Sequence, residues 1–193
     1  MRLDESSAGD AMFRDPSRRR PHNLYLRAPQ AYAKASGAVG PPPPQFTYRA
    51  AGGPAVGGTP ATHVVVRMGS DPAFDVTWDW DAAAHVWLRS IFGRPDVTTG
   101  GRRVAFANVV VHPVQYVNRL GGQCGDEGAH ADLGAPAQLT VLTGGMVVPG
   151  RWTQPDPSKA GVLTDVHGAP LGLAPGATWV ELAKPGEPIT STP

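Results

Sequence analysis

Acidic and apolar side chains alternate over residues 74–81, which read FDVTWDWD. Alternate residues of a strand share a face, so the pattern predicts a half-buried strand with Asp75, Asp79 and Asp81 on its polar side. Carboxylates two positions apart on a strand lie roughly 7 Å apart. That spacing would suit a paired acid and base or a cation site. We favour a solvated face opposite a tryptophan-rich core, because alternation alone predicts it.

A glycine-rich stretch further along the chain gathers side chains that can bind metals, namely Cys124, Asp126, Glu127, His130 and Asp132. Zinc takes such ligands, but structural zinc sites use paired Cys and His spacings, which this stretch lacks. A nucleophilic pair of Cys124 with His130 would need a lowered thiol pKa and an oxyanion hole. We therefore predict a polar surface loop, with no metal and no cofactor.

A second polar group lies near the N-terminus, where three arginines at positions 18–20 precede Pro21. The arginines could hold a phosphate or carboxylate, but a solvated basic run explains them better. His22, Asn23 and Tyr25 together form an adaptable hydrogen-bonding set. They form either a binding site or the packing of a domain junction, and the residues alone leave both open.

Five tryptophans could form a stacking platform for sugars or peptides, namely Trp78, Trp80, Trp87, Trp152 and Trp179. Four of them have apolar neighbours in strand patterns, which favours the core. Trp80 and Trp87 lie at the ends of a predicted hairpin, and we expect them to be partly exposed. With Asp79, Asp81 and the set at 22–25, they are the candidate binding residues. No Gly-x-Ser-x-Gly, His-Glu-x-x-His, Walker or dinucleotide motif occurs.

The composition limits the class of protein. The chain has 193 residues, 41% of them hydrophobic, with 24 Gly and 21 Pro, which favours one domain of short strands and many turns. A net charge of +1 gives no field that would recruit nucleic acid. The sequence has no apolar run long enough to span a membrane, and its first 25 residues lack the apolar centre of a signal peptide. One cysteine excludes an internal disulfide.

Turn signals separate seven to nine short strand patterns beyond the proline run at 41–44. Gly144-Gly145 predicts a two-residue hairpin turn between strands at 138–143 and 146–152. We therefore predict a mainly β fold, an antiparallel sandwich or partly open barrel over residues 45–193. Residues 1–44 are predicted to be a largely irregular extension with a proline-rich linker and one short helix at 29–35.

Six short motifs follow one another in an order that resembles the YerB-like bacterial lipoprotein family, mainly its C-terminal domain. They are Phe13-Arg14-Asp15 with residues 20–25, Val76-Thr77-Trp78 with Trp80-Asp81, residues 96–101 leading into 108–111, residues 145–152, Leu163-Thr164-Asp165 with Gly168, and residues 173–176 running into 178–182. The first motif resembles the end of the family's N-terminal domain. The resemblance covers nearly the whole chain.

The resemblance implies a function of unknown chemistry in an exported, membrane-anchored lipoprotein. This chain carries neither the signal nor the acylated cysteine of the family, so we interpret residues 1–44 as the remnant of an upstream domain. We expect a non-catalytic module that binds an envelope protein or a cell-wall glycan or peptide. The alternative is a hydrolase whose site lies between domains and uses His22 and Asn23 together with a missing N-terminal half.

Overall fold

The computed structural model describes residues 7–34, 44–55, 57–120, 127–156 and 158–193, with backbone alone over 117–120 and 127–131. The chain divides into two compact units, Met1–Pro42 and Pro43–Pro193. The interpretation of residues 1–44 as the remnant of an upstream domain stays a prediction.

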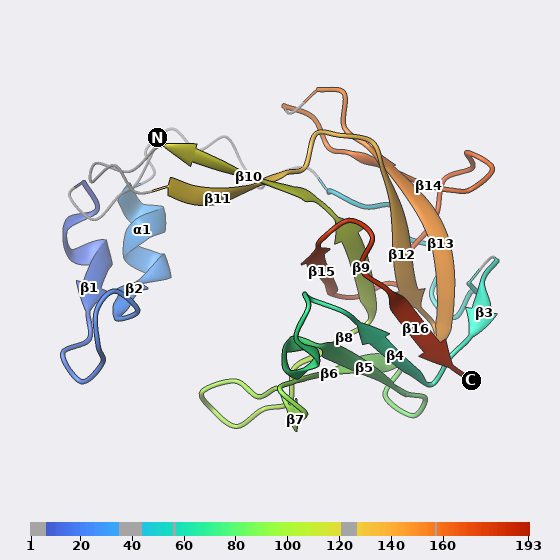
Figure 1. Cartoon of the computed structure of the whole chain (residues 1–193), viewed down its shortest axis with the longest axis horizontal. Helices are drawn as coiled ribbons and strands as arrows, with labels where there is room; N and C mark the ends of the chain where they lie inside the picture. The colour runs from blue at the N-terminus through green and yellow to red at the C-terminus, as the bar shows by residue number, and fades with distance from the viewer. Residues whose placement is uncertain (1–6, 35–43, 56, 121–126, 157) are drawn as a thin grey trace. The chain divides into compact units, whose positions relative to one another are not determined.

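The larger unit contains two six-stranded sheets, and the first has the order β14-β13-β12-β9-β15 with β3 beside β13 (Figure 1). Its strands are β3 (Thr59–Pro60), β9 (Asn108–Pro113), β12 (Ala137–Thr143), β13 (Met146–Thr153), β14 (Val162–Asp165) and β15 (Thr178–Ala183). β15 runs parallel to β9, whereas the other pairs of this sheet are antiparallel. The hairpin of β12 and β13 turns at Gly144-Gly145, as predicted.

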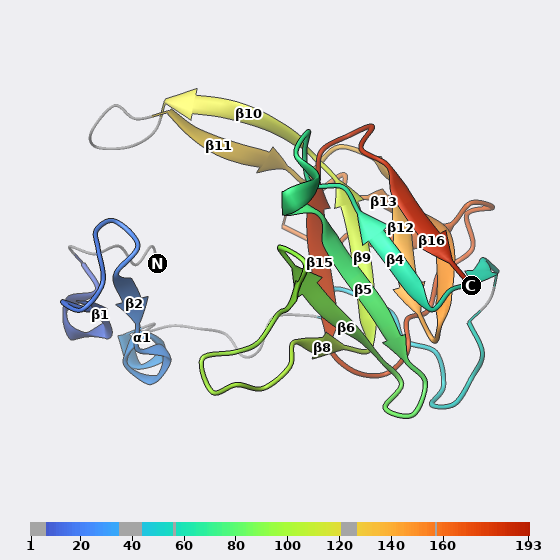
Figure 2. The same cartoon turned by 60° about the horizontal axis from the view of Figure 1, so that its bottom comes forward.

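The second sheet has the order β16-β4-β5-β6-β7, with β8 beside β6 (Figures 1 and 2). Its strands are β4 (His63–Val66), β5 (Val76–Asp81), β6 (Val86–Ile91), β7 (Arg94–Pro95), β8 (Ala105–Phe106) and β16 (Ile189–Thr192). All of its pairs are antiparallel. A separate two-stranded ribbon, β10 (Gln115–Leu120) with β11 (Glu127–Asp132), follows β9 along the chain.

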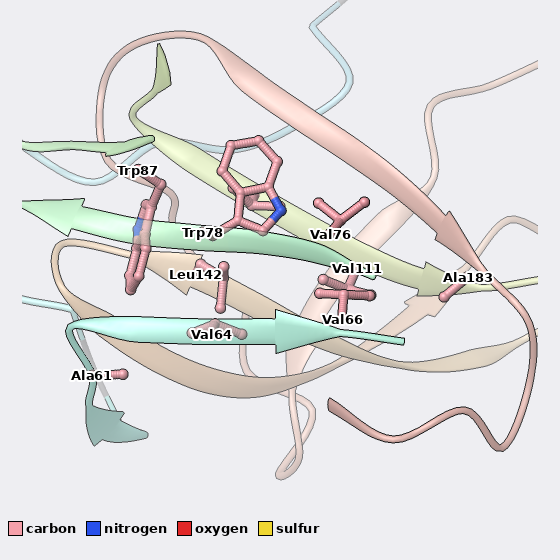
Figure 3. Packing of buried hydrophobic residues seen from close by; sticks show 10 residues of the cluster. Ala61, Val64, Val66, Val76, Trp78, Trp87, Val111, Leu142 and Ala183 are labelled. Carbon is pink, nitrogen blue, oxygen red and sulfur yellow. The ribbon is translucent and has the colours of Figure 1, made fainter. Parts of the chain in front are cut away.

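The main core lies between the two sheets. Figure 3 shows Trp78 and Trp87 from the second sheet together with Val111 and Leu142 from the first. Burial of these apolar side chains is the main force that holds the sheets together. The described fold is therefore mainly β and is a sandwich rather than a closed barrel, which confirms the predicted class.

A second apolar cluster covers the outer face of the first sheet. Val110 and Val141 point to this face, and Leu171, Leu173 and Phe46 pack on it. β9 is consequently buried on both faces, since Val109 and Val111 point inward. A strand buried on both faces reads as an unbroken apolar run, as residues 109–111 do.

One side chain of the alternating stretch does not follow the prediction. Phe74 was expected in the core but is largely exposed, where it packs edge-on against Phe92 at 5.5 Å. The strand begins only at Val76, because Pro72–Phe74 forms a 3-10 turn, η2. Asp71 caps this turn by accepting a hydrogen bond from the Ala73 amide at 2.9 Å.

The smaller unit is built from η1 (Gly9–Ala11), β1 (Met12–Arg14), β2 (Leu24–Leu26) and α1 (Ala28–Lys34). α1 confirms the predicted short helix, whereas the β1–β2 hairpin was not predicted. Among its described residues, the apolar side chains that this unit buries are small, those of Ala8, Ala11 and Ala31. It leaves Leu26 and Tyr32 exposed.

Candidate binding site beside Trp80

Each aspartate of the alternating stretch at 75–81 has a partner within the fold. Asp79 lies opposite His63 across the β4–β5 pair, with its Oδ1 2.6 Å from His63 Nδ1. Asp75 pairs with Arg67 at 2.9 Å. Asp81 accepts hydrogen bonds from the Ala83 and Ala84 amides at 3.0 Å and so closes the β5–β6 turn. These contacts give the acidic row roles in cross-strand pairing and turn formation.

The two tryptophans expected to be partly exposed differ in burial. They face each other across the β5–β6 pair with ring centroids 5.2 Å apart. Trp87 is fully buried, at 0% exposure, so the expectation is wrong for this residue. It lies in the core because β8 pairs with β6 beside it, Phe106 opposite Trp87. Trp80 is half-buried and reaches a surface pocket.

The pocket beside Trp80 has a volume of about 510 Å³. Its walls come from the β5–β6 turn, the β12–β13 turn and two loops, and they include Arg49, Trp80, His85, Gly144, Ala174 and Pro175, with residues 51–55. Trp80 and His85 meet edge to face at 6.2 Å. An aromatic wall next to a glycine-rich loop can hold a planar or ring-shaped group against polar backbone.

Arg49 supplies the positive charge of this pocket. Backbone pairing fixes its position, since the Arg49 amide donates to Leu173 O at 2.9 Å and Leu173 N donates to Thr47 O at 3.0 Å. Its guanidinium donates to Gly53 O at 2.8 Å, Thr143 Oγ1 at 2.9 Å and Gly172 O at 3.0 Å. All three acceptors are neutral. Burial lowers the pKa of Arg49 below its ordinary value.

Among the described residues, no carboxylate forms an ion pair with Arg49, and its Nη2 makes no hydrogen bond. A half-buried cation without a counter-charge is costly, which makes the position favourable for an anionic ligand. The guanidinium presents planar N–H donors that match a carboxylate. Arg49 therefore gives the pocket a means of anion recognition.

A buried hydrogen-bond network fixes the position of Thr143, one of the acceptors of the Arg49 guanidinium. Thr143 Oγ1, which accepts from Arg49, donates to Asn108 Oδ1 at 2.7 Å. Asn108 is fully buried and also bonds both the amide and the carbonyl of Ala174 at 2.9 Å. Satisfied buried networks of this kind hold their members rigidly. The network links β9 and β12 to the pocket wall at Ala174.

The β12–β13 turn needs its two glycines for a second reason beyond backbone geometry. Both have positive φ, 61° at Gly144 and 73° at Gly145. A Cβ on Gly144 would lie 2.8 Å from Arg49 Nη2, and one on Gly145 would lie 2.8 Å from Trp80 Nε1. The two glycines therefore leave the space that the side chains of Arg49 and Trp80 occupy against the turn.

A family model described as "Protein of unknown function (DUF3048) C-terminal domain" matches residues 64–180. The chain belongs to this family. Trp80, His85 and Gly144 lie inside the matched residues, and Arg49 lies before them. This membership confirms the predicted YerB-like relationship.

The fold is similar to the crystal structure of the YerB protein from Bacillus subtilis, with a TM-score of 0.69 and 20% sequence identity. The match covers 95% of this chain and 60% of that one, so the chain spans about three fifths of its structural relative. At this identity the likeness concerns the fold alone. No curated protein matches the chain, and no helix among the described residues could cross a membrane.

The N-terminal candidates of this DUF3048 protein lie in the smaller unit. Asn23 is buried, where its amide accepts from Arg14 Nη1 at 2.8 Å and donates to Asp15 O at 3.1 Å. It therefore closes the β1–β2 hairpin. Tyr25 stacks on Phe13 at 5.7 Å. His22 is exposed.

The metal-type side chains of the glycine-rich stretch fall largely outside the described residues. Cys124 and Asp126 are not described, and of Glu127 and His130 only the backbone is, within β11. Asp132 accepts a hydrogen bond from the Gly134 amide at 3.1 Å. The surface-loop interpretation of this DUF3048 segment stays a prediction.

Sequence reasoning missed two of the most informative side chains of this family member, Arg49 and Arg89. Arg49 stands in a stretch without periodicity, so no pattern indicated that it lines a pocket. Arg89 lies on the core face of β6 with Trp87, where it is buried beside Glu181. Its position two residues after Trp87 was the available signal, since alternate residues of a strand share one face.

Proposed function

We propose that the β domain is a non-catalytic binding module of a bacterial envelope protein and that the pocket beside Trp80 holds a carboxylate-bearing cell-wall glycan or peptide. The observation that carries this proposal is the guanidinium of Arg49, which lines the pocket with only neutral acceptors around it. A ligand carboxylate would supply the missing counter-charge.

The other walls favour a ligand with a ring or a short apolar group next to its acid. Trp80 offers the flat face and edge of an indole, and indoles pack well on sugar rings and apolar side chains. The turn at 144–145 and the loop at 51–55 bring backbone close to the pocket because their glycines have no side chains. Cell-wall glycans and their peptides combine these features, since they carry carboxylates beside sugar rings and small amino acids.

The envelope location rests on the resemblance to exported lipoproteins. Small changes in charge at such a pocket would change which ligand is held, because one Arg–carboxylate pair contributes both affinity and orientation.

Calorimetric titration of the full chain with a muropeptide and with its fully amidated form tests the proposal. We expect the free acid to bind at least about tenfold more tightly, in line with a charge-assisted hydrogen bond. Arg49→Gln should abolish the difference, whereas Arg151→Gln, which removes an exposed arginine on β13, should leave it unchanged.

Thermal melts separate binding from folding, because Arg49 also holds Thr143 and Gly172 in place. Arg49→Lys keeps the positive charge but loses the planar pair of N–H donors. This variant should therefore bind the free acid with an affinity between those of the wild-type chain and Arg49→Gln. Equal binding of acid and amide by the wild-type chain would contradict the proposal.

Hydrolysis at a site between domains, with His22 and Asn23, remains a second prediction. Asn23 is engaged in the β1–β2 hairpin, and no contact of the described residues favours hydrolysis over binding.

A further inference from the structure

A second hollow lies on the outer face of the first sheet, on the β9–β15 side, and has a volume of about 420 Å³. Its lining is mainly apolar and aromatic and has no Asp, Glu, Lys or Arg. The residues that matter here are Phe46, Val110, His112, Trp152, Val180 and Leu182. A hollow of this size lies within the range of small-molecule sites.

The parallel pairing of β9 and β15 forms the floor of this groove. Val180 lies beside Val110, and Leu182 lies beside His112. Paired residues of neighbouring strands point to the same face, and Val110 belongs to the outer cluster. The floor therefore places one imidazole among three aliphatic side chains.

His112 is buried, at 5% exposure, and its Nε2 has no hydrogen-bond partner among the described residues. Burial lowers the pKa of His112, so the ring is held in its neutral form. A buried ring nitrogen without a partner is unfavourable, and natural proteins seldom leave one unless something else supplies the bond.

The aromatic wall opposite His112 is held in place. Trp152 Nε1 donates to Leu133 O at 3.2 Å. Its ring lies against Gly161, where a Cβ would come within 2.0 Å of Cζ2. It also contacts Phe46 at 6.3 Å and His112 at 5.9 Å between ring centroids. A wall fixed in this way loses little freedom when a ligand binds.

We propose that this groove binds a neutral, mainly apolar small molecule that carries one hydroxyl group, with the hydroxyl bonded to His112 Nε2. A hydroxyl can donate or accept, so it satisfies the nitrogen in either tautomer of the neutral ring. The uncharged lining favours a neutral ligand over an ion. This site is separate from the pocket beside Trp80 and does not depend on its function.

Two probes that differ in one hydroxyl, 4-propylphenol and propylbenzene, test the proposal by NMR titration of the full chain. We expect the wild-type chain to bind the phenol about three- to tenfold more tightly than the hydrocarbon. The ¹⁵N resonance of His112 Nε2 should shift with the phenol only. His112→Phe should bind both probes equally.

His167→Phe is the matched control, because His167 is exposed and lies outside the groove. It should keep the preference for the phenol. Val180→Trp, at a partly exposed floor position, should fill the groove and weaken both probes without the loss of a buried residue. This variant keeps the test decisive if His112→Phe does not fold.

Three results would overturn the proposal. One is equal affinity of the wild-type chain for the two probes, and another is a preference for the phenol that persists in His112→Phe. The third is a lack of phenol binding while N-acetyl-leucinamide perturbs the groove resonances, which would point to a side chain of a protein partner.

Discussion

Arg89 on β6 and Glu181 on β15 join the two sheets through a two-point ion pair inside the sandwich. Arg89 Nε lies 3.3 Å from Glu181 Oε2, and Nη2 lies 3.3 Å from Oε1. Asp96 Oδ2 accepts a hydrogen bond from the remaining guanidinium nitrogen, Nη1, at 2.5 Å. Trp179 donates to Glu181 at 2.9 Å, and its ring centroid lies 4.9 Å from the guanidinium carbon. The core thus contains a charge cluster among aromatic rings.

Removing one partner of this ion pair should destabilise the fold far more than removing both partners. Arg89→Leu leaves the Glu181 carboxylate buried without its cation, which costs about 3–5 kcal/mol. The double variant Arg89→Leu with Glu181→Leu should recover much of that loss, because no unpaired charge remains at the pair. Urea melts of both variants and Glu181→Leu complete a double-mutant cycle. A single-variant loss below about 1 kcal/mol would contradict the buried-charge account.

The two faces of β5 should differ sharply in their tolerance of truncation. Trp78 is fully buried, so Trp78→Ala should destabilise the β domain by about 3–5 kcal/mol. Asp79 is partly exposed, and its contact with His63 is a surface pair, so Asp79→Ala should cost no more than about 1 kcal/mol. Thermal or denaturant melts decide the order. If Asp79→Ala were the more damaging, the assignment of the faces would be wrong.

The parts of the fold that could be predicted are those that depend on neighbours in sequence. The alternation around Trp78 and the turn at Gly144-Gly145 each need only a few adjacent residues to define them. Phe74 departs from its alternation because the local cap by Asp71 outweighs the strand pattern. Local chemistry therefore explains both the success and the exception.

The parts that could not be predicted depend on contacts between distant residues. Arg89 and Glu181 are 92 positions apart, and each interrupts an apolar pattern that makes sense only once the partner is known. Arg49 reaches Thr143 across 94 positions. The parallel pairing of β9 with β15 is likewise non-local, and it creates the groove at His112. A single sequence holds no record of such pairings.

Gly145→Ala should disturb the pocket beside Trp80 beyond its effect on the backbone. Both Gly145 and Gly93 have positive φ, 73° and 65°, so alanine is strained at either position. Only at Gly145 does the new methyl meet a side chain, 2.8 Å from Trp80 Nε1, whereas Gly93 has open space. We expect similar strain in both variants, but a changed Trp80 indole resonance and weaker ligand binding only in Gly145→Ala. Matched NMR spectra of the two would show whether the contact matters.

Acid should weaken the fold partly through His112. Burial lowers its pKa in the folded state below the ordinary 6.5 that applies in the unfolded chain. At a pH between the folded-state and unfolded-state pKa values of His112, the unfolded chain binds more protons than the folded one. The contribution of His112 to the free energy of unfolding is therefore full above about pH 6.5 and declines as the pH falls towards the folded-state pKa. The groove lining has no carboxylate that could offset a charged ring.

Urea melts from neutral pH to about pH 5 measure this contribution. His112→Phe should show a shallower loss of stability than the wild-type chain, whereas His167→Phe, on the surface, should retain the wild-type slope. Identical slopes for the wild-type chain and His112→Phe would refute the assignment.

Limited proteolysis should separate the two units, because they differ in how much they bury. The smaller unit has a buried apolar cluster of three alanines and leaves Tyr32 at 80% exposure. The larger unit buries two whole indoles, at Trp78 and Trp87. Since apolar burial provides most of the stability of a fold, we expect rapid cleavage upstream of Pro44 and a resistant β fragment that begins near that residue. Mass spectrometry of the time course identifies the cut sites. Equal resistance along the whole chain would mean that the smaller unit is stabilised by contacts beyond its own alanine cluster.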